Sequence, residues 1–173
     1  MLEEERALLA EQVKRCEREL RPRLLPQADV QRLVWIPGVG AIIAYTFVLE
    51  IDDVHRFPTA RHFHSYCRLV PGADNSGGKT RHKRSRDGNR YLKLAFHHAA
   101  VRAIQYVPEI KQEYQRWRRR KGKGIARALV AKELATIVYA VLKKGEAFNG
   151  TFKGHVLART KRSQWPRLAS PPA

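Results

Sequence analysis

A serine, Ser76, lies in a turn-forming Asn-Ser-Gly-Gly segment directly before a dense run of positive charge. The cations of that run are Lys79, Arg81, Lys83, Arg84 and Arg86. A hydroxyl on a glycine-rich, basic loop suits phosphate chemistry, because backbone N–H groups and cations together stabilise phosphate oxygens. The simpler interpretation of these residues alone is a solvated basic loop that only touches a polyanion.

The loop ends at Asp87-Gly88-Asn89, and apolar residues then recur at helical spacing. Asn89 is a favourable N-cap residue, so we predict a helix that begins at Arg90. The positive end of that helix would add to the loop cations, and we include Asn89 and Arg90 among the candidate nucleic-acid-binding residues. These cations cannot take the proton of Ser76; Asp74 and Asp87 are the local carboxylates that could.

A second candidate site lies in residues 28–51, where Pro37-Gly38-Val39-Gly40 separates two apolar segments. This is the pattern of a helix-hairpin-helix. Gly38 and Gly40 would let the backbone approach a phosphate closely, facing the first N–H groups of the second helix. A plain helical hairpin would also use glycine and proline here, so this alternative stays open.

The composition restricts the partners. The 173 residues carry a net charge of +18, from 34 Lys+Arg against 16 Asp+Glu, which favours a polyanion partner. The chain is 43% hydrophobic, enough to fold, and has no apolar run long enough to cross a bilayer. Its acidic N-terminus lacks a signal-peptide pattern, so we expect a cytoplasmic location. Cys16 and Cys67 form neither a metal motif nor a disulfide framework.

The helical periodicity predicts an all-α fold: a compact helical domain with a helix-hairpin-helix, preceded by the end of a coiled-coil helix and followed by a basic tail. We place the boundaries at 1–24, 25–148 and 149–173, with a break at Pro22 and Pro26 and no strand. The N-terminal helix fits either a coiled coil joining copies of the chain or a helix packed on its own domain.

Two motifs are rejected as sites. Residues 73–80 fit a relaxed P-loop pattern, but the basic residues after them cannot form the buried first turn of a helix. His62 and His64 form a lone His-x-His without other ligands at suitable spacing. We therefore predict no metal site and expect surface histidines.

The ordered set of motifs resembles the C-terminal domain of the insertion-sequence-110/116/902 transposases, serine recombinases guided by a bridge RNA. The motifs are Ile-Pro-Gly-Val-Gly, Phe57-Pro58, Leu69-Val70-Pro71, Ser76-Gly77-Gly78-Lys79, Gly88-Asn89-Arg90-Tyr91-Leu92-Lys93, Ala99-Ala100, a basic Lys-Gly-Lys-Gly segment and a helix like 128–142. The resemblance covers roughly residues 28–147. Arg68 departs from it, since the family usually has glycine before Leu-Val-Pro, as does the segment Arg84-Ser85-Arg86-Asp87.

The resemblance implies that Ser76 is the nucleophile that attacks a DNA phosphodiester and becomes joined to the phosphate. It also implies DNA and a guide RNA as partners, and a separate RuvC-like domain whose acidic residues hold magnesium. We find no such acidic cluster here, so we expect no cofactor in this chain, and magnesium and catalysis only together with that domain. The alternatives are a non-catalytic helix-hairpin-helix module for DNA or RNA and a purely structural oligomerisation fragment, which would not explain the charge.

Overall fold

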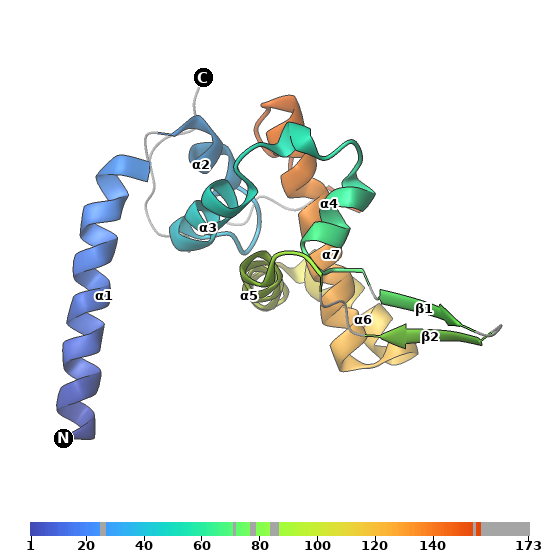
Figure 1. Ribbon diagram of the computed structural model, residues 1–173, viewed down its shortest axis with the longest axis horizontal. Helices are drawn as coiled ribbons and strands as arrows, with labels where there is room; N and C mark the ends of the chain where they lie inside the picture. Colours follow the sequence, from blue (N-terminus) through green and yellow to red (C-terminus); the bar gives the residue numbers. More distant parts are fainter. Residues whose placement is uncertain (25–26, 71, 77–78, 84–86, 154, 157–173) are drawn as a thin grey trace.

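The computed structural model describes residues 1–24, 27–70, 72–76, 79–83, 87–153 and 155–156, and these are mainly helical (Figure 1). The prediction of a helical fold is confirmed. The α-helices are α1 (Leu2–Leu24), α2 (Ala28–Leu33), α3 (Ala41–Ile51), α4 (Ala60–Tyr66), α5 (Arg90–Tyr106), α6 (Pro108–Lys121) and α7 (Lys123–Lys144), with a 3₁₀ turn at Val54–Arg56. Two antiparallel hairpins, which the sequence analysis missed, add β1 (Gly72–Ser76) with β2 (Lys79–Lys83) and β3 (Thr151–Phe152) with β4 (His155–Val156).

Helices α5 and α7 pack against each other at the centre, and α3, α4 and α6 surround them. The small residues Ala95, Ala99 and Ala103 recur on the buried face of α5 and let its neighbours approach closely. Phe96 of the same face stacks on Phe47 of α3 with 4.3 Å between ring centroids. This aromatic contact joins the two segments that flank the β1–β2 hairpin in the sequence.

Helix α1 stands apart from this helical body (Figure 1). It continues to Leu24, so the predicted break at Pro22 is wrong; Pro22 falls in the last turn, and Pro26 lies outside the described residues. The residues of its apolar seam are all exposed: Leu2, Leu9, Val13, Cys16 and Leu20. Within the described part of the chain, these apolar residues therefore do not pack on the chain's own domain, which was one of the two alternatives for this helix.

The connection between α6 and α7 is a single residue. Helix α6 ends at Lys121 and α7 begins at Lys123, so Gly122 alone separates them. Gly122 has φ +82°, a conformation that side chains rarely adopt, which explains why glycine stands there. Gly145 ends α7 in the left-handed conformation and donates its N–H to the Val141 carbonyl, as a glycine at a helix C-terminus commonly does.

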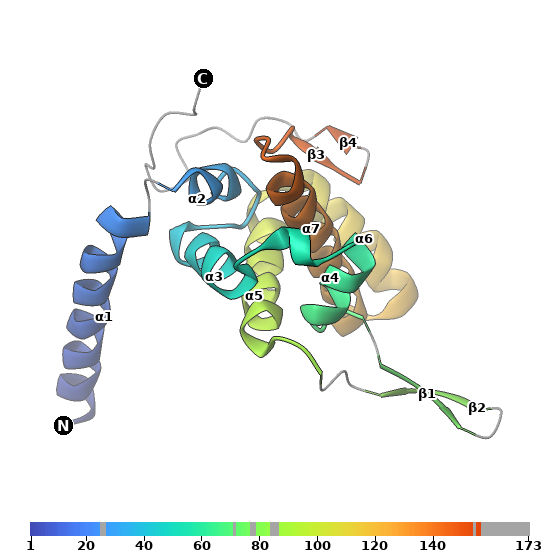
Figure 2. The ribbon, with the colours of Figure 1, turned by 45° about the horizontal axis from the view of Figure 1, so that its top comes forward.

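The C-terminal β3–β4 hairpin belongs to the packed domain (Figure 2). Phe152 is only 1% exposed, and Lys153 Nζ lies 3.0 Å from Oε1 of the buried Glu113 on α6. Lys153 also lies over the Trp117 ring, 4.5 Å from its centroid. The predicted tail therefore begins too early at residue 149, because Phe152 is buried in the core and Lys153 contacts Glu113 and Trp117 of α6. Residues 157–173 lie outside the described residues.

None of the helices in the part of the chain that the structure describes is long and apolar enough to span a membrane.

Candidate nucleic-acid interface

Ser76 lies at the last position of β1, and its backbone partner across the hairpin is Lys79 at the first position of β2. The hairpin projects away from the helical body in both views (Figures 1 and 2). The predicted irregular loop is thus wrong for residues 72–76 and 79–83. Two signals were available: Lys79, Arg81 and Lys83 alternate with period two, and Gly-Gly is a favoured dipeptide of tight hairpins.

The register of the hairpin gathers the predicted site residues. Directly opposite positions of an antiparallel pair share a face, and successive positions alternate between faces. The pairs Ser76–Lys79 and Asp74–Arg81, together with Lys83, therefore occupy positions on one face. Arg84 and Arg86, the other predicted cations, lie outside the described residues. The start of β2 at Lys79 also confirms the rejection of a P-loop, which requires a helix there.

Gly88 and Arg68 fix the base of the hairpin. Gly88 has φ +100°, and a Cβ atom there would lie 2.4 Å from the Tyr66 carbonyl oxygen. Arg68 adopts φ +55°, a left-handed conformation that favours glycine, and its Nε donates a hydrogen bond of 2.7 Å to the Gly88 carbonyl. The chain segments entering and leaving the hairpin are thus bonded to each other.

Asn89 is the N-cap of α5, as predicted. Its Oδ1 accepts hydrogen bonds from the backbone N–H groups of Tyr91 and Leu92, and its Nδ2 donates one to Glu50 of α3. The Asn89 backbone N–H donates to the Tyr66 carbonyl at 2.6 Å. Both polar groups of the side chain are therefore engaged within the fold, and Asn89 positions α5 relative to α3 and α4. Its predicted contact with nucleic acid would have to be indirect.

Gly38 and Gly40 have different environments. Gly38 is buried with φ +81°, and a Cβ atom there would lie 2.1 Å from the Ala99 carbonyl oxygen of α5. The close backbone approach predicted for a phosphate is thus made to α5 instead. Gly40 is the N-cap of α3, and a Cβ atom added to it would meet no other atom within 4 Å. A phosphate contact at Gly40 remains a prediction.

The exposed face of α5 continues the positive charge beyond the hairpin. Arg90 lies over the Tyr91 ring at 4.9 Å, and Arg102 lies over the Tyr106 ring at 4.7 Å. Both tyrosines are exposed, and the helix contains no Asp or Glu. Helix α6 ends in four successive cations, Arg118 to Lys121. Exposed arginines interleaved with aromatic rings are typical of nucleic-acid surfaces.

The histidines do not form a metal site. His64 is buried and shares a hydrogen bond of 3.1 Å with Thr136, so the expectation of a surface histidine is wrong there. Burial, and then the charge of Lys132, lower the pKa of His64 to about 4. Among the described residues no three His, Cys, Asp or Glu side chains gather as metal ligands. The described residues therefore offer no carboxylate cluster that would hold magnesium.

Known proteins similar to this chain identify the domain. The model of the transposase IS116/IS110/IS902 family matches residues 30–115, and this stretch is a transposase domain of that family. A probable family 20 transposase of Pseudomonas aeruginosa is 29% identical over 149 residues, which make up 83% of this chain and 44% of the relative.

Two further relatives give similar values. The transposase for insertion sequence element IS1111A of Coxiella burnetii is 28% identical over 137 residues, 76% of this chain and 38% of the relative. A pilin gene-inverting protein of Moraxella bovis is 30% identical over 123 residues, 68% of this chain and 38% of the relative. The chain spans less than half the length of these curated relatives.

Proposed function

We propose that this chain is the DNA-binding portion of a transposase and that Ser76 is the nucleophile of its strand cleavage and transfer. The observation that carries the proposal is the hairpin register, which assigns Ser76 to the same face as Lys79, Arg81 and Lys83. The transposase and gene-inverting relatives support DNA as the substrate. The resemblance to serine recombinases adds a guide RNA as a second partner.

In the proposed step, a bond forms between Ser76 Oγ and the scissile phosphorus, while the bond from phosphorus to one deoxyribose oxygen breaks. The cations of the hairpin would stabilise the negative charge that develops on the phosphate oxygens. The serine proton needs an acceptor, and the leaving oxygen needs a proton. Asp74 shares the face of Ser76 and is the carboxylate within the hairpin; otherwise the acceptor comes from the separate acidic domain.

The test combines the chain with the acidic domain of a related transposase, its guide RNA and a DNA target. We expect a covalent protein–DNA adduct that survives denaturant and is absent for Ser76→Ala, although DNA binding is retained. Ser85→Ala is the matched control, because it removes a hydroxyl from the same basic segment and should leave the adduct unchanged. An adduct that persists in Ser76→Ala would contradict the proposal.

The second candidate function is a binding module without chemistry, favoured by the Arg–Tyr pairs on α5, which need no nucleophile. In that case Ser76→Ala would be silent in every assay. Both functions predict salt-dependent binding, because a protein that neutralises roughly six to ten phosphates loses about three to five orders of magnitude in affinity between low and moderate salt.

We also propose that the apolar seam of α1 pairs with the α1 of a second copy. The seam residues are exposed and spaced as in a coiled coil. A helix of 23 residues is short for an isolated coiled coil, so the bound nucleic acid would add to the stability of the dimer. Leu9→Lys should convert the dimer to a monomer in light-scattering measurements of the mass; an unchanged mass would contradict this contact.

A further inference from the structure

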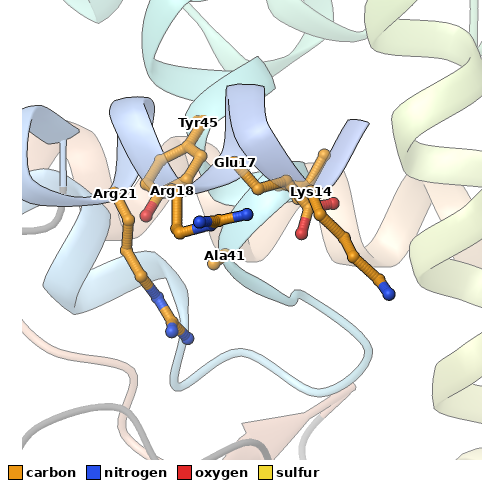
Figure 3. A pocket seen from close by; sticks show the side chains of 7 residues that line it. Lys14, Glu17, Arg18, Arg21, Ala41 and Tyr45 are labelled. Carbon is orange, nitrogen blue, oxygen red and sulfur yellow. The ribbon is translucent and has the colours of Figure 1, made fainter. Parts of the chain in front are cut away.

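A hollow lies where α1 passes the N-terminus of α3 (Figure 3). The α1 side chains that line it are those of Lys14, Glu17, Arg18 and Arg21, and the α3 residues are Ala41, Ile42 and Tyr45. It lies in a different part of the fold from the hairpin that carries Ser76; of the candidate residues described above, only Gly40, the N-cap of α3, adjoins it.

The N-terminus of α3 forms one wall of the hollow. Helix α3 has 11 residues, its N-cap Gly40 offers no side-chain hydrogen bond, and its first turn contains no acidic residue. The first N–H groups of the helix therefore have no side-chain acceptor from the cap, and the helix dipole there is not compensated by a carboxylate. A helix end of this kind favours an anion.

Tyr45 provides an independent sign of a missing ligand. The residue is only 7% exposed, yet its hydroxyl has no hydrogen-bond partner among the residues that the structure describes. Buried hydroxyl groups are normally paired, because leaving one unpaired costs stability. Burial raises the pKa of Tyr45 against the opposing effect of Arg21, so the phenol stays protonated and can donate. The hydroxyl thus lacks an acceptor at a site whose other groups are mainly cationic.

Lys14, Arg18 and Arg21 give α1 three cations here against the one carboxylate of Glu17, although Arg18 also pairs with Glu11 at 3.2 Å. We propose that this hollow binds a backbone phosphate of the nucleic acid, held by the α3 N-terminus, the Tyr45 hydroxyl and the α1 cations. Helix α1 stands apart from the helical body, so close packing does not fix the α1 wall of the hollow against a phosphate. The inference rests on the proposed function, since it adds a contact for the same polymer.

The test is the binding of a short labelled DNA duplex to the full chain carrying Ser76→Ala, so that cleavage plays no part. Tyr45→Phe should weaken binding about ten-fold, the loss of one hydrogen bond to a charged group. The same change should raise the thermal midpoint of the DNA-free protein, because it removes an unpaired buried hydroxyl. A structural role for the hydroxyl would lower that midpoint, so the opposite signs separate the two roles.

Arg21→Gln should lower the slope of log affinity against log salt by about one, the effect of one phosphate contact. Arg23→Gln is the matched control: Arg23 is exposed on the same helix but does not line the hollow, and the slope should stay unchanged. Equal slopes for the two variants, or unchanged affinity of Tyr45→Phe, would overturn the inference while leaving the Ser76 adduct intact. Conversely, the proposed function could fail while this inference holds. If no Ser76 adduct forms but Tyr45→Phe and Arg21→Gln have the expected effects on binding, only the role of Ser76 as nucleophile is rejected.

Discussion

The two hairpins of this molecule are held in opposite ways. The β3–β4 hairpin buries Phe152 in the core and places Lys153 on the buried Glu113. The β1–β2 hairpin is held at its base, where Gly88 meets Tyr66 and Arg68. The first therefore contributes to the stability of the domain. The second projects from the body and carries the positions of Ser76, Lys79, Arg81 and Lys83, and its two ends are bonded to each other at the base.

The largest loss of stability is expected when the buried anchor of the β3–β4 hairpin, Phe152, is removed. Phe152→Ala should destabilise the domain by about 3–5 kcal/mol, because it removes a fully buried ring and leaves a cavity. Chemical denaturation measures the loss, and Phe152→Leu should recover most of it. At temperatures where Phe152→Ala is still folded, the yield of the DNA adduct should match that of the parent. A reduced yield there would mean that the C-terminal hairpin serves the chemistry as well.

A smaller effect on stability is expected at the base of the projecting hairpin. Gly88→Ala places a Cβ atom against the Tyr66 carbonyl and forces alanine into a strained conformation. It should therefore lower the free energy of unfolding by about 2–3 kcal/mol. Gly145→Ala is the control, since Gly145 also has positive φ but has open space around it, and it should cost about 1 kcal/mol. Unlike Phe152→Ala, Gly88→Ala should lower the adduct yield at equal folded fraction. Equal yields would show that the base does not direct the hairpin.

Asn89→Ala should cost about 1–2 kcal/mol, because the cap of α5 and the bond to Glu50 are lost together. Asn89→Asp keeps the cap but places a carboxylate beside Glu50, so its stability should lie between that of Asn89→Ala and that of the parent. Denaturation midpoints rank the three proteins. An Asn89→Ala protein as stable as the parent would contradict a stabilising role of the Asn89 side chain.

The smallest effect is expected for Arg68→Gly. Glycine relieves the left-handed strain at position 68 but loses the hydrogen bond to the Gly88 carbonyl, and each contribution is about 1 kcal/mol. We therefore expect the free energy of unfolding of Arg68→Gly to differ from that of the parent by less than about 1 kcal/mol in either direction. Arg68→Ala keeps the strain and loses the bond, so it should be less stable than Arg68→Gly. The reverse order would contradict the strain at this position.

The sequence predicted what local patterns determine. Asn89 and the apolar spacing after it correctly predicted the start of α5. What it could not predict depends on distant partners. The docking of the β3–β4 hairpin depends on α6, because Lys153 contacts Glu113, 40 residues away in the chain. Gly38 looked like a phosphate-binding glycine because its contact with Ala99 exists only once α5 has packed on that connection.

The candidate site likewise combines features that local sequence patterns determine with features that depend on residues elsewhere in the chain. The residue types around Ser76 were evident in the sequence, but their common face depends on a strand register that the prediction of an irregular loop excluded. The hollow at Tyr45 was not predictable at all, because nothing in the sequence shows that a tyrosine in an apolar helix would lack a hydrogen-bond partner. Its α1 cations looked like the solvated side of a coiled coil.

The most direct test of the central claim is to locate the covalent bond. The protein–DNA adduct formed with the acidic domain and guide RNA would be digested with protease and nuclease, and the modified peptide sequenced by mass spectrometry. We expect a phosphoester on Ser76, in the peptide that continues into Gly77-Gly78-Lys79. A nucleotide attached to Ser85, to a tyrosine of α5 or to any other residue would contradict it.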